Sequence, residues 1–309
     1  MKIVFFGNPD FCFYSLKKLN SSNHELISVV TSTDRKSGRG LKLLPSFVKK
    51  TALNLNIPII EVNNIKSKEF EEKLISLEAD LFVVVAFKFL PDSIINIPKY
   101  GSINIHPSIL PKYRGSSPIQ YALLNGDNQT GVSIIHLNNR IDSGTILGQE
   151  KIDIDSISTF GEMYEKLGIL SSELIIKVID DIKNKKTNPI IQDESKKTLA
   201  PKIKKEDLKI DWNNSSLDIH NKIRAFDPFP GAYSFLNGKR IKFFKSSEYD
   251  YNDNNLKQPG EIIIKDKLLL IKTNTKKMIN IGMVQLEGKN KISSSDFVKS
   301  LENKKYILK

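Results

Sequence analysis

The most constraining feature of the chain is an uninterrupted apolar run, Leu81-Phe82-Val83-Val84-Val85. A strand with one face in solvent alternates apolar and polar residues, whereas a strand covered on both faces is apolar throughout. The run is short for a helix and rich in β-branched valine, which favours a strand. It therefore predicts a central strand of a parallel sheet with helices on both sides.

Strand and helix patterns alternate around this run through the first half of the chain. We expect strands at 2–6, 26–30, 58–60, 79–87, 101–105 and 130–137, and helices at 11–19, 47–55, 67–77 and 159–183. Such alternation is typical of a doubly wound α/β domain, here a Rossmann-like parallel sheet. Gly7 follows the first strand, but the Gly-x-Gly-x-x-Gly pattern is missing, which argues against a dinucleotide cofactor.

The sequence changes character towards its last third. The stretch 187–205 contains prolines, mixed charge and no clean period, so we interpret 190–206 as a linker that follows a first domain of residues 1–189. Beyond it, β-like runs lie at 233–235, 240–245, 260–265, 267–273 and 278–285. The Asn237-Gly238 pair between two of them is a strong hairpin signal. Short strands at this density predict a small OB-like β-barrel over residues 207–309.

Charge is unevenly distributed along the chain. The whole sequence carries 47 Lys and Arg against 35 Asp and Glu, and residues 190–309 hold 24 of the former and 15 of the latter. A basic region of this kind favours a polyanionic partner, nucleic acid before membrane. Lysine far outnumbers arginine, however, and Asn and Ile are abundant, as in proteins from AT-rich genomes. Charge alone therefore leaves nucleic-acid binding and no such partner equally open.

Several protein classes are excluded or disfavoured by composition. The sequence has no run of about 18 apolar residues, so no membrane span is expected. Its N-terminus turns polar after Phe6 and lacks a secretory signal, which predicts a cytoplasmic protein. The one cysteine, Cys12, excludes an intramolecular disulfide and a Cys-rich metal site. With only four scattered histidines, we expect no metal.

The segment 101–115 contains the side chains best suited to catalysis. Asn104 and His106 are two residues apart on a predicted strand, so their side chains project from the same face. They lie near its carboxyl end, where open α/β sheets bind ligands. Asp142 follows the next predicted strand in a polar turn. A strand-end histidine is more often a satisfied polar residue than a catalyst, and we assign no role to His136 or His220.

An Asn, a His and an Asp that converge would suit addition of an amine to a carbonyl. An amide can donate a hydrogen bond to the developing oxyanion. A protonated imidazole can do the same or shuttle a proton. A carboxylate can orient the imidazole and help to take a proton from the amine.

The pattern Asn-x-His-Pro-Ser-x-Leu-Pro-x-x-x-Gly, followed by Asp-x-Gly, resembles the folate-dependent formyltransferase superfamily. The resemblance implies a formyltransferase domain whose catalytic residues are Asn104, His106 and Asp142. It implies that the run Ser108, Ile109, Leu110 and Pro111 contacts the folate, and that the one-carbon donor is 10-formyltetrahydrofolate. No metal is implied.

Further segments resemble the members of this superfamily that formylate methionyl-tRNA. The opening Gly7-Asn8-Pro9-Asp10-Phe11 is similar to theirs, as are Ile210-Asp211-Trp212 and the segment 224–232 before the second domain. The basic segment 34–42 resembles their tRNA-contacting insertion loop, and its glycines and cations are suited to binding phosphate. The resemblance implies contacts from Arg35, Lys36, Arg39 and Lys42 to initiator methionyl-tRNA, and hence a role in translation initiation.

Three functions remain to be distinguished. The first is transfer of a formyl group to the methionine amine of initiator methionyl-tRNA by a monomer. The second is transfer to a small amine, such as a nucleotide sugar or a purine precursor, by the same three residues without use of the basic loop. The third is an RNA-binding protein without catalysis, against which the intact Asn104, His106 and Asp142 argue.

Overall fold

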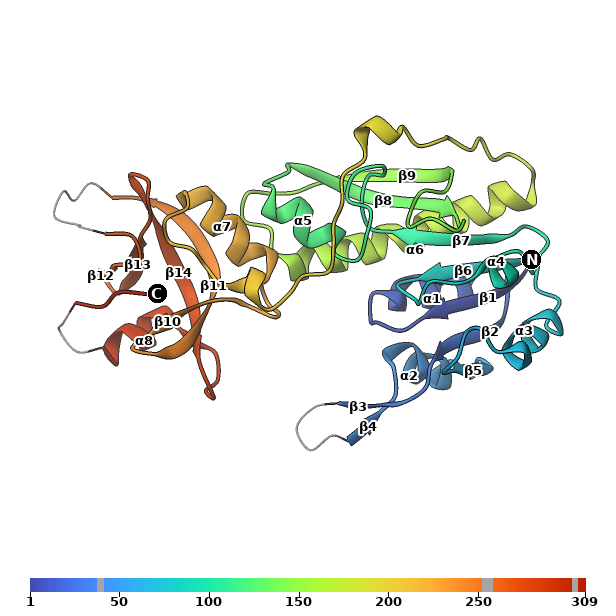
Figure 1. Ribbon diagram of the computed structural model, residues 1–309, viewed down its shortest axis with the longest axis horizontal. Coiled ribbons are helices and arrows are strands. Elements are labelled where there is room, and N and C mark those ends of the chain that lie inside the picture. The colour runs from blue at the N-terminus through green and yellow to red at the C-terminus, as the bar shows by residue number, and fades with distance from the viewer. Residues whose placement is uncertain (38–41, 252–257, 302–304) are drawn as a thin grey trace. The chain divides into compact units, whose positions relative to one another are not determined.

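The computed structural model describes residues 1–37, 42–251, 258–301 and 305–309 (Figure 1). Its contacts divide the chain into two compact units. Unit 1 comprises residues 1–118, 130–152 and 164–201, and unit 2 comprises residues 119–129, 153–163 and 202–309. Two short segments from the first half of the sequence thus belong to unit 2. The predicted division into 1–189, 190–206 and 207–309 stays a prediction.

Unit 1 is built on a seven-stranded sheet with the strand order β5-β2-β1-β6-β7-β8-β9. Its strands are β1 (Lys2–Gly7), β2 (Glu25–Ser32), β5 (Ile59–Val62), β6 (Leu81–Val85), β7 (Ser102–His106), β8 (Gln129–His136) and β9 (Ile146–Asp153). A separate hairpin is formed by β3 (Arg35–Ser37) and β4 (Lys42–Leu44). The helices are α1 (Cys12–Asn20), α2 (Phe47–Asn54), α3 (Lys68–Ile75), α4 (Asp92–Ile95), α5 (Pro118–Leu124) and α6 (Phe160–Lys183), and the last two continue into unit 2.

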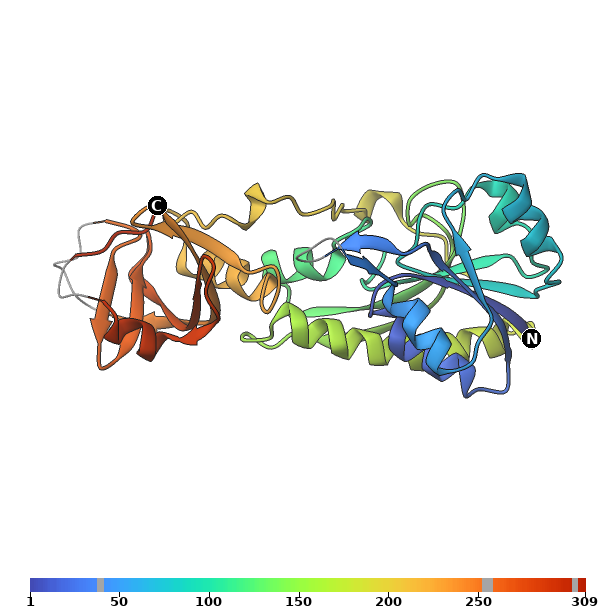
Figure 2. The same ribbon diagram turned by 90° about the horizontal axis from the view of Figure 1, so that it is seen from below.

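Strand β6 is buried along its whole length, as its apolar run predicts. It pairs in parallel with β1 on one side and with β7 on the other. Phe82 and Val84 pack in a cluster with residues of α3 and α4 on one face of the sheet. On the other side, α1 is hydrogen-bonded to α6 between Ser15 and Ser171, and Figure 2 shows these two helices together on one face. Two covered faces require the run without polar residues.

Unit 2 contains an antiparallel sheet with the order β10-β11-β14-β13-β12, to which β15 adds by pairing with β14. The strands are β10 (Ala232–Leu236), β11 (Lys239–Asp250), β12 (Ile262–Lys265), β13 (Leu268–Lys272), β14 (Lys277–Leu286) and β15 (Ile292–Ser293), and the helices are α7 (Ser216–Ala225) and α8 (Ser294–Lys299). Trp212 and Phe243 stack edge to face, 5.6 Å apart, inside its core.

The predicted α/β fold with a second β domain is confirmed, with two differences in the first sheet. Strand β8 pairs antiparallel with β7, so the sheet is mostly, not wholly, parallel. Hydrophobic pattern is the same for either strand direction, which the sequence therefore leaves undetermined. Strand β9 was not predicted, because it is a largely polar edge strand in which only Ile146 is buried.

Several other elements were also missed. They are the β3–β4 hairpin, α4, α5, α7, β15 and α8. Helix α7 did have a local signal, because Ser215 at its N-cap accepts from the backbone N–H of Asp218, and its hydroxyl also bonds the Asp218 carboxylate. This is a variant of the capping box, in which the side chain three residues on is an acid. The segment 190–206 contains one short 3-10 turn, Glu194–Lys196, and a second, Glu206–Leu208, begins at its last residue.

Candidate active site

The carboxyl end of β7 carries two of the predicted catalytic residues. Asn104 lies between Val84 of β6 and Ile135 of β8, and His106 ends the strand. His106 is buried and Asn104 is partly exposed. Within the described ranges, the side-chain amide of Asn104 has no hydrogen-bond partner in the protein. Its N–H groups are therefore available to a ligand at this edge of the sheet.

The His106 ring has a defined tautomer in this arrangement. Its Nε2 lies 2.9 Å from the carbonyl oxygen of Tyr113, and a carbonyl can only accept, so Nε2 carries a proton. Its Nδ1 lies 3.6 Å from Oδ2 of Asp142. A carboxylate also only accepts, so closer approach between these two atoms requires a proton on Nδ1 as well.

Asp142 is held from the loop that follows β7. Its Oδ2 accepts a hydrogen bond of 2.8 Å from the backbone N–H of Gly115. The Asp142 backbone is left-handed, with φ of 49°, which is uncommon outside glycine and best tolerated by Asp and Asn. Its second carboxylate oxygen has no partner among the residues that the structure describes. The structure therefore brings His106 and Asp142 together, with one carboxylate oxygen left for a ligand.

The run predicted to contact folate lies directly after His106 and is only partly accessible. Ser108 and Leu110 are buried, whereas Ile109 and Pro111 are partly exposed. The Ser108 hydroxyl donates to the carbonyl of Lys112, and the Leu110 side chain packs against Ile135 and Ile146. These four contacts stay a prediction, and the accessible surface of the run is that of Ile109 and Pro111.

The segment after residue 189, interpreted as a linker, is part of the site in unit 1. Two backbone hydrogen bonds join this segment to Arg114. The Arg114 N–H donates to the carbonyl of Thr198 at 3.0 Å, and the Ala200 N–H donates to the carbonyl of Arg114 at 2.7 Å. Gln192 is buried and bonds to Arg114 and to the loop of Asp142. Sequence reasoning assigned no role to Arg114 and missed Gln192, because a buried glutamine in an aperiodic stretch has no local signature.

Two pKa shifts mark the electrostatics around the site. Hydrogen bonding from the Arg114 guanidinium lowers the pKa of Glu194, so this carboxylate stays ionised beside the arginine. Burial lowers the pKa of His136 at the end of β8, which favours the neutral imidazole at neutral pH.

The predicted tRNA-contacting residues are distributed over the β3–β4 hairpin. Arg35 and Lys36 belong to β3, and Lys42 begins β4. Arg39 lies outside the described residues. The hairpin presents the exposed side chains of Leu43 and Leu44 in its second strand.

Neither a metal site nor a membrane span is found in the part of the chain that the structure describes. No group of three or more His, Cys, Asp or Glu side chains is placed to hold a metal ion. No helix there is long and apolar enough to cross a bilayer.

Comparison with known proteins identifies the class of enzyme. The model of the formyl transferase family matches residues 1–179, and the model of the formyl transferase C-terminal domain matches residues 202–302. The chain is therefore a formyltransferase. A curated methionyl-tRNA formyltransferase of Staphylococcus epidermidis is 38% identical over 303 residues, covering 97% of this chain and 96% of that protein. A methionyl-tRNA formyltransferase of Thermodesulfovibrio yellowstonii is 40% identical over 297 residues, covering 96% of this chain and 94% of that protein. The chain belongs to the methionyl-tRNA formyltransferase family.

Solved structures share the fold at lower sequence identity. WlaRD, described as a sugar 3N-formyl transferase in the presence of dTDP and 5-N-formyl-THF, is 23% identical with a TM-score of 0.68. The match covers 94% of this chain and 99% of that one. HypX from Aquifex aeolicus, solved with tetrahydrofolic acid, is 17% identical with a TM-score of 0.66. There the match covers 96% of this chain and 47% of HypX.

Proposed function

We propose that this enzyme transfers the formyl group of 10-formyltetrahydrofolate to the methionine amine of initiator methionyl-tRNA. The observation that carries the proposal is near full-length identity of 38–40% to curated methionyl-tRNA formyltransferases, together with the contact of His106 with Asp142 beside Asn104. The product would be formyl-methionyl-tRNA for translation initiation. We expect the enzyme to act as a monomer in the cytoplasm.

The site supports one reaction sequence. The neutral methionine amine attacks the formyl carbon, which forms a C–N bond and turns the formyl oxygen into an oxyanion. The Asn104 amide, which has no partner among the described residues, donates to this oxygen, and a protonated His106 adds positive charge. Asp142 takes the proton that the amine loses. The bond between the formyl carbon and N10 of the folate then breaks, and N10 receives that proton back through the His106–Asp142 pair.

The folate would lie against the accessible part of the run after His106. Ile109 and Pro111 offer an apolar surface there, while Ser108 and Leu110 support the loop from inside. We propose that the tRNA contacts Arg35, Lys36 and Lys42 of the hairpin, and Arg39, which lies outside the described residues. Lysine and arginine at a strand-paired loop can bind the phosphates of the acceptor stem, whose exposed bases lie next to the reacting amine.

The acceptor is tested by offering two amines in parallel. The purified enzyme is mixed with 10-formyltetrahydrofolate and either charged initiator methionyl-tRNA or a small amine, for which glycinamide ribonucleotide and an amino-sugar nucleotide serve. We expect formylated tRNA and no product from either small amine. The Arg39→Ala variant should lower kcat/KM for tRNA about tenfold or more, as loss of a charged contact does.

The outcomes separate the three candidate functions. Product from a small amine alone, with no effect of Arg39→Ala, would assign the enzyme to small-molecule formylation. RNA binding without any product would leave only the binding role.

A further inference from the structure

Three segments of unit 1 contact one another next to the proposed catalytic pair, His106 and Asp142. Residues 107–117 follow β7, residues 138–145 follow β8, and residues 190–201 were expected to be a linker. The third segment joins the first two. It forms one bridge between Leu199 and Arg114 of the first loop, and another between Ile190 and Ile146, the first residue of β9. The backbone of this segment is therefore tied to the first loop and to the strand that follows the second loop.

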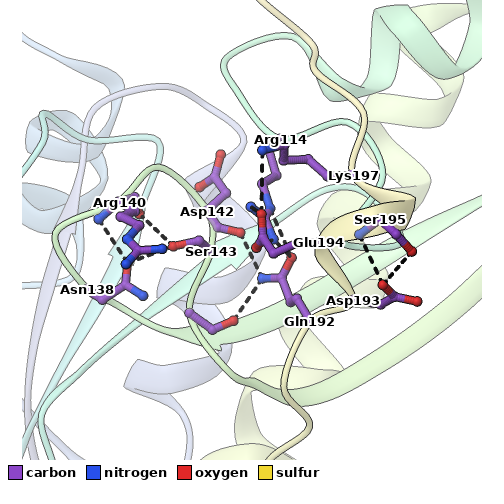
Figure 3. A network of polar contacts seen from close by, with 11 residues as sticks. Arg114, Asn138, Arg140, Asp142, Ser143, Gln192, Asp193, Glu194, Ser195 and Lys197 are labelled. Carbon is purple, nitrogen blue, oxygen red and sulfur yellow. Dashed lines mark hydrogen bonds and ion pairs between the residues drawn. The ribbon is translucent and has the colours of Figure 1, made fainter.

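The side chain of Gln192 completes the connection, as Figure 3 shows. Its Oε1 accepts from Nε and Nη2 of Arg114, at 3.0 and 2.8 Å. Its Nε2 donates to the backbone carbonyls of Asp142 and Gly144, both at 2.8 Å. An amide has two acceptor and two donor sites, and all four are used. Rotating the amide by 180° would set N–H against guanidinium and oxygen against carbonyls, so only one orientation fits.

Arg114 is also held by a second partner, the carboxylate of Glu194. Its side chain is 5% exposed, and it reaches Glu194 through Nη2 at 2.7 Å and Nη1 at 3.2 Å. The guanidinium fork fits two acceptors in one plane, which a lysine ammonium cannot reproduce. The residue after Arg114 is Gly115, whose N–H bonds to the Asp142 carboxylate. Asp142 is thus held at its side chain through the first loop and at its carbonyl through Gln192.

We infer that Gln192 and Arg114 are positioning residues for the Asp142 carboxylate. This inference rests on the proposed function, since it assigns Asp142 to proton transfer. Residues 139–141 beside it are exposed, and Asp142 itself has a left-handed backbone, so the turn has little packing of its own. The two hydrogen bonds that Gln192 donates to the carbonyls of Asp142 and Gly144 replace that packing. A misplacement of a catalytic group by about 1 Å can lower the rate about 100-fold, so the position of this turn decides turnover.

The Gln192→Glu variant tests the inference because it separates the two halves of the network. Glutamate has the same shape and still accepts from Arg114, but it sets an oxygen against the carbonyls of Asp142 and Gly144. We expect kcat for methionyl-tRNA to fall about 10- to 100-fold. The KM values for tRNA and folate should stay within about twofold, because the Gln192 side chain is buried and offers neither substrate a contact surface. Ser195→Ala is the matched control, since Ser195 is exposed on the same segment and its hydroxyl donates to Asp193, away from Gln192 and Arg114.

A double variant distinguishes a shared network from general destabilisation. Arg114→Lys alone should also lower kcat, and Gln192→Glu combined with it should lose no more than the worse single variant, because both act through Asp142. The pH profile of kcat should change in the single variants and stay unchanged in Ser195→Ala. Circular dichroism and thermal unfolding establish that each variant is folded. If Gln192→Glu does not fold, Gln192→Asn takes its place, because its shorter amide reaches either Arg114 or the carbonyls of the turn but not both.

Each result bears on the inference. A folded Gln192→Glu enzyme with wild-type kcat, a loss confined to KM, or losses that multiply in the double variant would overturn it. An unmodified enzyme that does not formylate methionyl-tRNA would instead overturn the proposed function, and the two failures are thereby distinguished.

Discussion

At the scale of the residue, the site is a set of polar groups whose hydrogen-bonding capacity is either fully used or left open. His106 uses Nε2 on the Tyr113 carbonyl, and Asp142 uses one oxygen on the Gly115 N–H. The amide of Asn104 and the second oxygen of Asp142 have no partner among the described residues. In a folded protein most polar groups are paired, so open ones at a strand end point to a ligand.

The Asn104→Ala variant tests the open amide directly. Loss of one oxyanion donor lowers kcat about 100- to 1000-fold, because its effect is confined to the transition state. We therefore expect a fall of that size with KM for both substrates nearly unchanged. Steady-state formylation of methionyl-tRNA measures it, and Ser195→Ala, at an exposed residue outside the Asp142 loop, serves as the control. Near-normal turnover in Asn104→Ala would remove Asn104 from the catalytic residues.

At the scale of the element, short turns set the register of the strands. The hairpin between β10 and β11 pairs Leu236 with Lys239 across the two residues Asn237 and Gly238. Both have positive φ, of 49° and 76°, as a type I′ turn requires. The Asn-Gly signal therefore predicted the hairpin and the register of its first strand pair. By contrast, nothing local indicates that β8 runs antiparallel to β7.

Gly238→Ala isolates the backbone contribution of that turn. A Cβ at this position meets no other atom within 4 Å, so the change introduces no clash. The left-handed backbone alone disfavours alanine, and we expect the free energy of unfolding to fall by about 1 kcal/mol. Denaturant unfolding followed by circular dichroism measures it. Gly288 is also left-handed with space for a Cβ, so Gly288→Ala should lower the free energy of unfolding by a similar amount. An unchanged free energy of unfolding in either variant would mean that the turn adopts another conformation without cost.

At the scale of the whole molecule, charge is the property that bears on the partner. The chain has a formal net charge of +12, and residues 190–309 carry nine of that excess. A protein that replaces counterions on phosphate binds more weakly as salt rises, whereas binding of a small ligand with few charges is affected much less. The uneven charge therefore distinguishes the two substrates of the proposed reaction.

Salt should weaken tRNA binding and leave folate binding nearly unchanged. Between about 50 and 200 mM salt, we expect KM for methionyl-tRNA to rise on the order of tenfold or more if several phosphates are contacted. The KM for 10-formyltetrahydrofolate, measured in the same series, is the internal control. Equal salt dependence of both would indicate that the basic charge reflects composition rather than tRNA binding.

The sequence by itself determined the α/β class, the position of β6, the β10–β11 hairpin and the identity of the strand-end residues. These features depend on local pattern, since burial on both faces, turn conformation and side-chain spacing along a strand are readable over a few residues. Tertiary structure alone decided the direction of β8, the addition of β9 and the role of residues 190–201. Gln192 contacts Arg114 across 78 positions and Asp142 across 50. Contacts between residues so far apart leave no periodic trace in the chain, because they depend on where folding brings the segments together.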